Sequence, residues 1–234
     1  YYYRISAVDN AGNESSKTSD VSSRAHDPAG NYSLSFGGSD DYVTVPHTDD
    51  LNFGGNIPMS VSFWMYKNTN GEMHHLGKRA AQNGNCSFQI AGTGNNVGIG
   101  SSNNWDVLSI TSPTTLIETW AHVVFTFDGD VMIGYINGTA VDNASGRTLG
   151  PTSTAPLMIG RLNYGAPSDG KFDEVGIWNR AITQAEIQAY MSTSLSGSES
   201  DLVGYWNFNE GSGTTASDAT SNSNDGTING ATWS

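Results

Sequence analysis

The chain is poor in cysteine and in positively charged residues, and it lacks a long apolar segment. Cys86 is its one cysteine, which excludes an intramolecular disulfide. Ten Lys and Arg against 23 Asp and Glu give a net charge of -13, which argues against nucleic acid or an anionic membrane surface as a partner. No apolar run approaches the roughly 18 residues that span a bilayer, so we expect no membrane insertion.

Small and polar residues take the place of the missing charges. The chain has 28 glycines and many Asn, Ser and Thr residues, a composition typical of a secreted bacterial surface module. Its 36% hydrophobic content over 234 residues is enough for one β-sandwich with a sizeable core and a small appendage.

Turn signals and alternation predict an antiparallel meander in the middle of the chain. Asp128-Gly129 and Asn137-Gly138 are hairpin turn dipeptides that would join three strands. Apolar residues alternate along 121–127, while Trp120, His122 and Val124 share the opposite face. The first of these strands is therefore expected to be central and covered on both sides.

The segment Gly170–Met191 predicts a strand followed by a short helix. Phe172 and 175–178 supply β-prone residues, and Ile182, Glu186 and Tyr190 follow at helical spacing. Asp173 and Glu174 are adjacent, so they should point to opposite faces of the sheet. One of these carboxylates is then expected to be half-buried, where a metal or a hydrogen-bonding partner must compensate its charge.

Five segments carry a resemblance to a known family. FDEV at 172–175, followed by WNRAIT and an AEI helix, is similar to the closing elements of laminin-G-like jelly rolls in the concanavalin A-like lectin and glucanase superfamily. The resemblance extends, in the family's usual order, over 33–46, 61–67, 119–138 and 155–161. It implies an all-β antiparallel sandwich with one short helix, stabilised by calcium. Such domains usually bind glycans or proteins and are only sometimes enzymes.

The two ends of the chain raise separate expectations. Residues 1–26 resemble the last two strands of a fibronectin type III domain, and 27–234 would form the jelly roll. Residues 201–234 resemble a segment that normally precedes the strand at 33–46 in this family. We expect this tail to fold back and supply permuted closing strands, since an unpaired sheet edge is a liability. The alternative is that the tail begins a second repeat.

Calcium requires six to eight oxygen ligands, usually gathered from loops. Four aspartates are the candidate ligands: Asp40, Asp41, Asp173 and Asp218. The alternative is that Asp173 accepts bonds from backbone amides and that Asp40 and Asp41 are solvated turn residues.

A glycan site requires an aromatic platform with nearby groups that recognise hydroxyls. Two candidates lie on the predicted non-core face of a strand and four fall in predicted loops; they are Trp64, Tyr66, Trp105, Arg161, Asn163 and Tyr164. Taken singly, a Trp or Tyr in a sandwich is more often a packing residue than a binding residue. The prediction therefore depends on whether they converge.

Catalytic signatures of the superfamily are missing from the sequence. Its retaining glycosidases carry a Glu-x-Asp-x-x-Glu strand, which this chain does not contain. A polysaccharide hydrolase or lyase is therefore the less favoured reading. We expect a non-catalytic, lectin-like module of a larger secreted or cell-surface protein that binds a polysaccharide and contacts other domains of that protein. The alternative is a structural or protein-binding spacer of an adhesin.

Overall fold

The computed structural model describes residues 2–3, 21–22, 32–80, 85–101, 107–163 and 165–234. Near the N-terminus, β1 (Tyr2–Tyr3) pairs antiparallel with β2 (Val21–Ser22). The other residues of the expected fibronectin-like hairpin lie outside this described set. That resemblance therefore stays a prediction.

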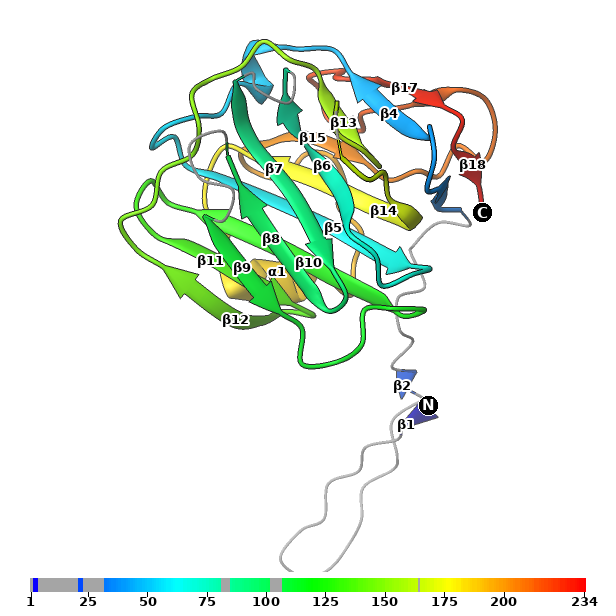
Figure 1. Ribbon diagram of the computed structural model, residues 1–234, viewed down its shortest axis with the longest axis horizontal. Coiled ribbons are helices and arrows are strands. Elements are labelled where there is room, and N and C mark those ends of the chain that lie inside the picture. The colour runs from blue at the N-terminus through cyan, green and yellow to red at the C-terminus, as the bar shows by residue number, and fades with distance from the viewer. Residues whose placement is uncertain (1, 4–20, 23–31, 81–84, 102–106, 164) are drawn as a thin grey trace, which may run out of the picture.

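From residue 32 onward the structure is a sandwich of two antiparallel sheets (Figure 1). The predicted fold class, an antiparallel jelly roll with a short helix, is confirmed. In the first sheet the spatial order is β12-β11-β10-β5-β14-β3-β18, and β15 also pairs with β14. The strands of this sheet are β3 (Leu34–Gly37), β5 (Met59–Lys67), β10 (Trp120–Phe127), β11 (Met132–Ile136), β12 (Thr139–Ala144), β14 (Asp169–Trp178), β15 (Leu202–Trp206) and β18 (Thr232–Trp233).

The second sheet covers the inner face of the first. Its order is β16-β17-β4-β13-β6-β7-β8-β9, so that β6 to β9 form one half of the layer. In Figure 1 this half lies in front of β5 and β10. The strands are β4 (Tyr42–Val45), β6 (Met73–Arg79), β7 (Cys86–Thr93), β8 (Asn96–Gly100), β9 (Leu108–Thr111), β13 (Leu157–Ile159), β16 (Thr215–Ala216) and β17 (Gly226–Asn229).

Strand β10 shows how alternation builds the core. Val123 and Phe125 point between the sheets and are at most 1% exposed. On the opposite face Val124 is also fully buried, in a second apolar cluster with Trp178 and Ile187. The expectation of a central strand covered on both sides is therefore confirmed.

Helix α1 (Gln184–Tyr190) provides that cover on the outer face of the first sheet. It begins after Thr183, which forms a capping box with Glu186: each side chain accepts a hydrogen bond from the other residue's backbone amide. Ile187 is its buried contact with the sheet. In the described part of the chain no helix is long and apolar enough to cross a bilayer.

The tail of the chain contributes strands to both sheets. β15 pairs with β14 and β18 pairs with β3 in the first sheet, while β17 pairs with β4 in the second. Trp206 is fully buried between them, and its indole Nε1 donates to the carbonyl of Asn224. Residues 201–234 therefore pack as part of this sandwich.

Candidate functional site

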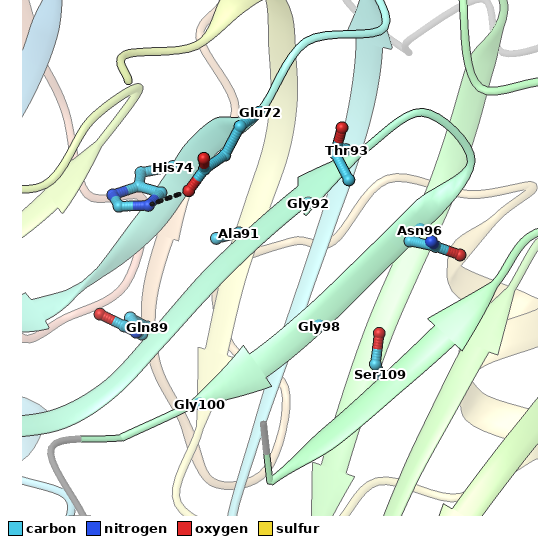
Figure 2. Close-up of a pocket in the computed structure, with 10 residues that line it drawn as sticks. All are labelled: Glu72, His74, Gln89, Ala91, Gly92, Thr93, Asn96, Gly98, Gly100 and Ser109. Carbon is cyan, nitrogen blue, oxygen red and sulfur yellow. Dashed lines mark ion pairs between the residues drawn. The ribbon is translucent and has the colours of Figure 1, made fainter. Parts of the chain in front are cut away.

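A groove of about 310 Å³ lies on the outer face of the second sheet, over strands β6 to β9 (Figure 2). Glycines and polar side chains make up most of its lining. The lining residues are Glu72, His74, Gln89, Ala91, Gly92, Thr93, Asn96, Gly98, Gly100 and Ser109.

The groove follows from the alternation of residues along β8. Val97 and Ile99 point into the core, so Asn96, Gly98 and Gly100 face outward. Gly98 has no side chain to cover the backbone of the sheet. A Cβ added there would meet only β9, at 3.3 Å from the Leu108 carbonyl oxygen. The floor of the groove is therefore backbone, with longer side chains along its margins.

The polar side chains of the groove are held by neighbouring groups. Gln89 Oε1 accepts from Arg79 Nη1 at 3.0 Å, so the amide has one orientation. Asn96 Oδ1 accepts from Thr111 Oγ1 at 2.6 Å, across the β8–β9 pair. Side chains held in this way present hydrogen-bonding groups at fixed positions, which reduces the entropy lost when a ligand binds.

A carboxylate marks one margin of the groove. Glu72 Oε1 lies 3.4 Å from Nε2 of His74, and the Glu72 side chain is 71% exposed whereas that of His74 is 4% exposed. Figure 2 shows the pair beside β7, at the opposite margin from Ser109. His74 is fixed below by the segment that follows β13, because its backbone amide donates to the Ala166 carbonyl.

Trp64 and Tyr66, predicted as the aromatic platform, lie on the first sheet and not in this groove. Trp64 is 5% exposed and packs against His122 with ring centroids 5.1 Å apart. Tyr66 is half-buried beside Trp120, with ring centroids 5.8 Å apart. A buried ring cannot stack on a sugar, so Trp64 acts in packing.

The other predicted glycan-binding residues are divided. Arg161 stacks over the Tyr42 ring at 5.4 Å and lies 3.4 Å from a carboxylate oxygen of Asp40. Asn163 Nδ2 donates to the carbonyls of Arg79 and Ala80, so it fastens the segment after β13 to the end of β6. Trp105 and Tyr164 lie outside the described residues. The four described members of the predicted set, Trp64, Tyr66, Arg161 and Asn163, do not converge on one surface.

The groove residues were not predicted, because the sequence was searched for an aromatic platform and this groove is lined mainly by glycines and polar side chains. The signal that could have found them is the alternation in NVGIG at 96–100, where every outward position is glycine or asparagine. A strand whose solvent face has so little bulk leaves its backbone open to close approach.

The four aspartates predicted to bind calcium are not gathered together. Among the described residues no group of three or more His, Cys, Asp or Glu side chains is placed to hold a metal ion. Asp40 is 96% exposed beside Arg161, and Asp41 Oδ2 accepts from the Gly37 amide at 2.6 Å. These two residues occupy turn positions, and calcium binding stays a prediction.

Asp218 organises the loop between β16 and β17. Its Oδ1 accepts from the amides of Tyr205 and Thr220, both at 2.9 Å. Its Oδ2 accepts from Thr220 Oγ1 and from the Asn224 amide, both at 2.8 Å. Four protein donors thus account for this buried carboxylate, which is 9% exposed.

Asp173 and Glu174 are both buried, against the expectation that only one would be. The register of β14 against β5 shifts after Asp173, and Glu174 has φ of 52°. This bulge breaks the simple alternation. Asp173 is 0% exposed, and burial raises its pKa to about 8 although the Glu174 amide donates to it.

Glu174 is bonded to the tail and to the segment after α1. Its carboxylate accepts from Ser194 Oγ at 3.0 Å and from the hydroxyl of Tyr205. Burial, and then the Glu174 charge, raise the pKa of Tyr205. These contacts tie β14, β15 and the segment after α1 together beneath the outer face of the first sheet.

Two packed antiparallel sheets with one short helix among the described residues are the architecture of a concanavalin A-like jelly roll. The family model for the concanavalin A-like lectin/glucanases superfamily matches residues 36–188, and the chain belongs to this superfamily. None of the curated proteins matches the chain by sequence.

Solved structures share the fold at low sequence identity. A candidate carbohydrate-binding protein from Bacteroides ovatus is similar with a TM-score of 0.70 and 19% identity, covering 88% of this chain and 60% of its own. The present chain thus spans about three fifths of that protein. Domain 4 of AbnA, an extracellular GH43 arabinanase from Geobacillus stearothermophilus in complex with arabinotriose, has a TM-score of 0.51, 18% identity and coverage of 82% of both chains. A heptameric SAP-like pentraxin from Limulus polyphemus has a TM-score of 0.56 and 14% identity, covering 69% of this chain and 82% of its own.

Proposed function

We propose that this chain is a non-catalytic carbohydrate-binding module of a secreted or cell-surface protein, and that it binds a polysaccharide in the groove over β6 to β9. The observation that carries the proposal is the lining of that groove. Amide, hydroxyl and carboxylate groups stand along a floor made of Gly92, Gly98 and Gly100. Such groups donate to and accept from sugar hydroxyls, and the bare floor lets a chain lie close to the strands.

The structural relatives support this assignment. The Bacteroides ovatus protein is a candidate carbohydrate-binding protein, and the arabinanase domain was solved with arabinotriose. At identities below one fifth these likenesses concern the fold alone. The ligand class is therefore proposed from the groove and only supported by the relatives.

The carboxylates around the groove favour binding over hydrolysis. Glycosidases of the common kind use two carboxylates that are about 5 to 9.5 Å apart across the scissile bond. The described lining residues include a single carboxylate, that of Glu72, and it is paired with His74. The groove is thus suited to hold a chain without cleaving it.

The expected affinity is modest, because the described lining contains no Trp, Tyr or Phe side chain. Hydrogen bonds to sugar hydroxyls largely replace bonds to water, so each contributes only about 0.5–1.5 kcal/mol. A polysaccharide compensates by offering many equivalent sites along one chain.

Affinity electrophoresis and calorimetry with a panel of polysaccharides test the proposal. The panel contains arabinan, galactan, xylan, mannan, mixed-linkage β-glucan, hydroxyethyl cellulose and polygalacturonate. The variant Asn96→Ala/Ser109→Ala removes two exposed groups from the groove, and Asn143→Ala removes an exposed amide from β12 of the other sheet as a matched control.

We expect at least one polysaccharide to bind, the groove variant to lose tenfold or more in affinity, and the control to bind as the parent does. Binding unchanged in the groove variant would place the site elsewhere. Silence across the panel would favour the spacer reading.

A further inference from the structure

The charges around the groove narrow the ligand class further. Among the described residues, no Lys or Arg side chain lines the groove, whereas the exposed carboxylate of Glu72 does. An acidic sugar or a sulfate ester is normally recognised by a charge-assisted bond from a cation. The described lining offers no Lys or Arg for such a bond; its histidine, His74, faces the Glu72 carboxylate at 3.4 Å, and Glu72 itself presents a like charge.

The cations of the adjoining strands are turned to other partners. Arg79, on β6, is 3% exposed and donates to Gln89. Lys78 is 1% exposed, with Nζ 3.0 Å from Nδ1 of His47, and burial lowers its pKa to about 8.

Lys67, at the end of β5, is 1% exposed. Its Nζ donates to the Gly94 carbonyl in the turn between β7 and β8. Moving any of these three groups into the groove would break its present bond and expose a buried stem. The groove therefore cannot acquire a cation by a simple change of rotamer.

The long-range field acts in the same direction. The chain carries a net charge of -13, which repels a polyanion before contact. Within the groove the repulsion is local, because the Glu72 carboxylate stands at its margin and interacts over distances shorter than the Debye length of about 8 to 10 Å.

We propose that the groove selects an uncharged polysaccharide, and that Glu72 is a specificity-determining residue that excludes chains bearing carboxylate or sulfate groups. This inference rests on the proposed carbohydrate-binding function. Its mechanism is exclusion: the Glu72 carboxylate accepts bonds from neutral hydroxyls, while a negative group at the same place meets a like charge with no Lys or Arg of the described lining to offset it.

The test compares two derivatives of one polysaccharide. Whichever neutral member of the panel binds is hydroxyethylated in one sample and carboxymethylated in another, at the same low degree of substitution. The added groups are similar in size and differ in charge. Affinities are measured in 50 mM and 500 mM NaCl for the parent chain, for Glu72→Gln, and for Asp50→Asn, which removes one exposed charge from the short 3-10 helix Asp49–Leu51.

We expect the hydroxyethyl derivative to bind the parent chain within threefold of the unmodified polysaccharide, and the carboxymethyl derivative at least tenfold more weakly in 50 mM NaCl. This gap in affinity between the hydroxyethyl and carboxymethyl derivatives should shrink in 500 mM NaCl and in Glu72→Gln, but not in Asp50→Asn. A carboxymethyl derivative that binds as well as the hydroxyethyl one overturns the inference. So does a gap that Glu72→Gln leaves unchanged.

The two proposals fail in different ways. If a neutral polysaccharide binds and Asn96→Ala/Ser109→Ala abolishes the binding, the carbohydrate function stands whatever the derivatives do. If only polygalacturonate binds, and in the groove, the function stands and the inference is wrong. If no polysaccharide binds, both are wrong.

Discussion

Trp64 and Asp173 are direct cross-strand neighbours in the β5–β14 pair, and both are buried on the outer face of the first sheet. From the sequence, Trp64 was predicted to belong to a sugar-binding site and Asp173 to a metal site. Both side chains are enclosed by the protein and lie in one packed layer with Ser62 and His122, whose Oγ and Nε2 are 2.7 Å apart. Calcium binding at Asp173 stays a prediction. The proposed ligand-binding face is on the other sheet.

Trp64→Ala should reduce stability without changing glycan specificity. Removing a buried tryptophan costs about 3–5 kcal/mol, and Trp64→Phe should cost less because it keeps part of the packing. Chemical denaturation measures the loss, and calorimetry on Trp64→Phe measures the affinity, which should stay within twofold of the parent. A tenfold loss of affinity in folded Trp64→Phe would restore this residue to the binding site.

Asp173→Asn should flatten the pH dependence of stability. Burial raises the pKa of this carboxyl from its ordinary value of 3.8 to about 8 in the folded chain. Between these values the folded state holds a proton that the unfolded state has released, so the free energy of unfolding falls as pH rises. The slope approaches about 1.4 kcal/mol per pH unit near the middle of this window and vanishes above pH 8.

Urea denaturation in a calcium chelator from pH 4.5 to 8.5 measures the slope, with the exposed Asp142→Asn as control. As pH rises, the free energy of unfolding of Asp173→Asn should increase relative to that of the parent. Equal slopes in the two proteins would show that Asp173 titrates normally.

The Tyr205–Glu174 bond should contribute measurably to stability. Tyr205→Phe keeps the ring in its apolar cluster and removes the donor to a buried carboxylate, which costs about 1–3 kcal/mol. Combined with Glu174→Gln in a double-mutant cycle, it should give a coupling energy above about 1 kcal/mol. If the two substitutions change the free energy of unfolding additively, the hydrogen bond between Tyr205 and Glu174 is contradicted. Tyr66→Phe, on the same sheet, should change stability by less than about 0.5 kcal/mol.

Asp218→Ala should destabilise the tail equally in calcium and in chelator. Its four donors belong to the protein, so their loss costs about 3 kcal/mol whether or not the metal is present. Thermal unfolding in 5 mM calcium and in chelator checks this for the parent, for Asp218→Ala and for the isosteric Asp218→Asn. A calcium-induced rise in Tm that disappears in Asp218→Asn would assign the residue to a metal site.

Gly98→Val should block the groove without unfolding the sheet. Its Cβ would lie 3.3 Å from the Leu108 carbonyl, a contact relieved by a few tenths of an ångström of movement. Valine also favours a strand. Affinity should fall tenfold or more while Tm changes by only a few degrees. Unchanged affinity would mean that the ligand does not reach the floor of β8.

The fold was predictable because it depends on local patterns. Alternation along β10 and the Asn137-Gly138 turn, where both residues have positive φ, specify the meander from neighbouring residues alone. Thr183 and Glu186 likewise specify where the helix begins. These signals lie within a few residues of each other in the sequence.

The site was not predictable because it depends on contacts between distant segments. Trp64 faces away from the core of the sandwich, as its alternation indicates, but that face is buried by pairing and packing that single-strand periodicity does not reveal. The bulge at Glu174 likewise buries two carboxylates where alternation allows one. Glycines at outward positions were a readable signal, but they carry no chemistry of their own.

The most direct measurement is chemical-shift mapping of the chain with a soluble oligosaccharide of the polysaccharide that binds most tightly. The account predicts amide shifts concentrated in β6 to β9, with Asn96, Gly98 and Ser109 among the largest, and small shifts at Tyr66 and Trp120 on the first sheet. Shifts centred on Tyr66 and Trp120, with β8 and β9 unperturbed, would contradict it.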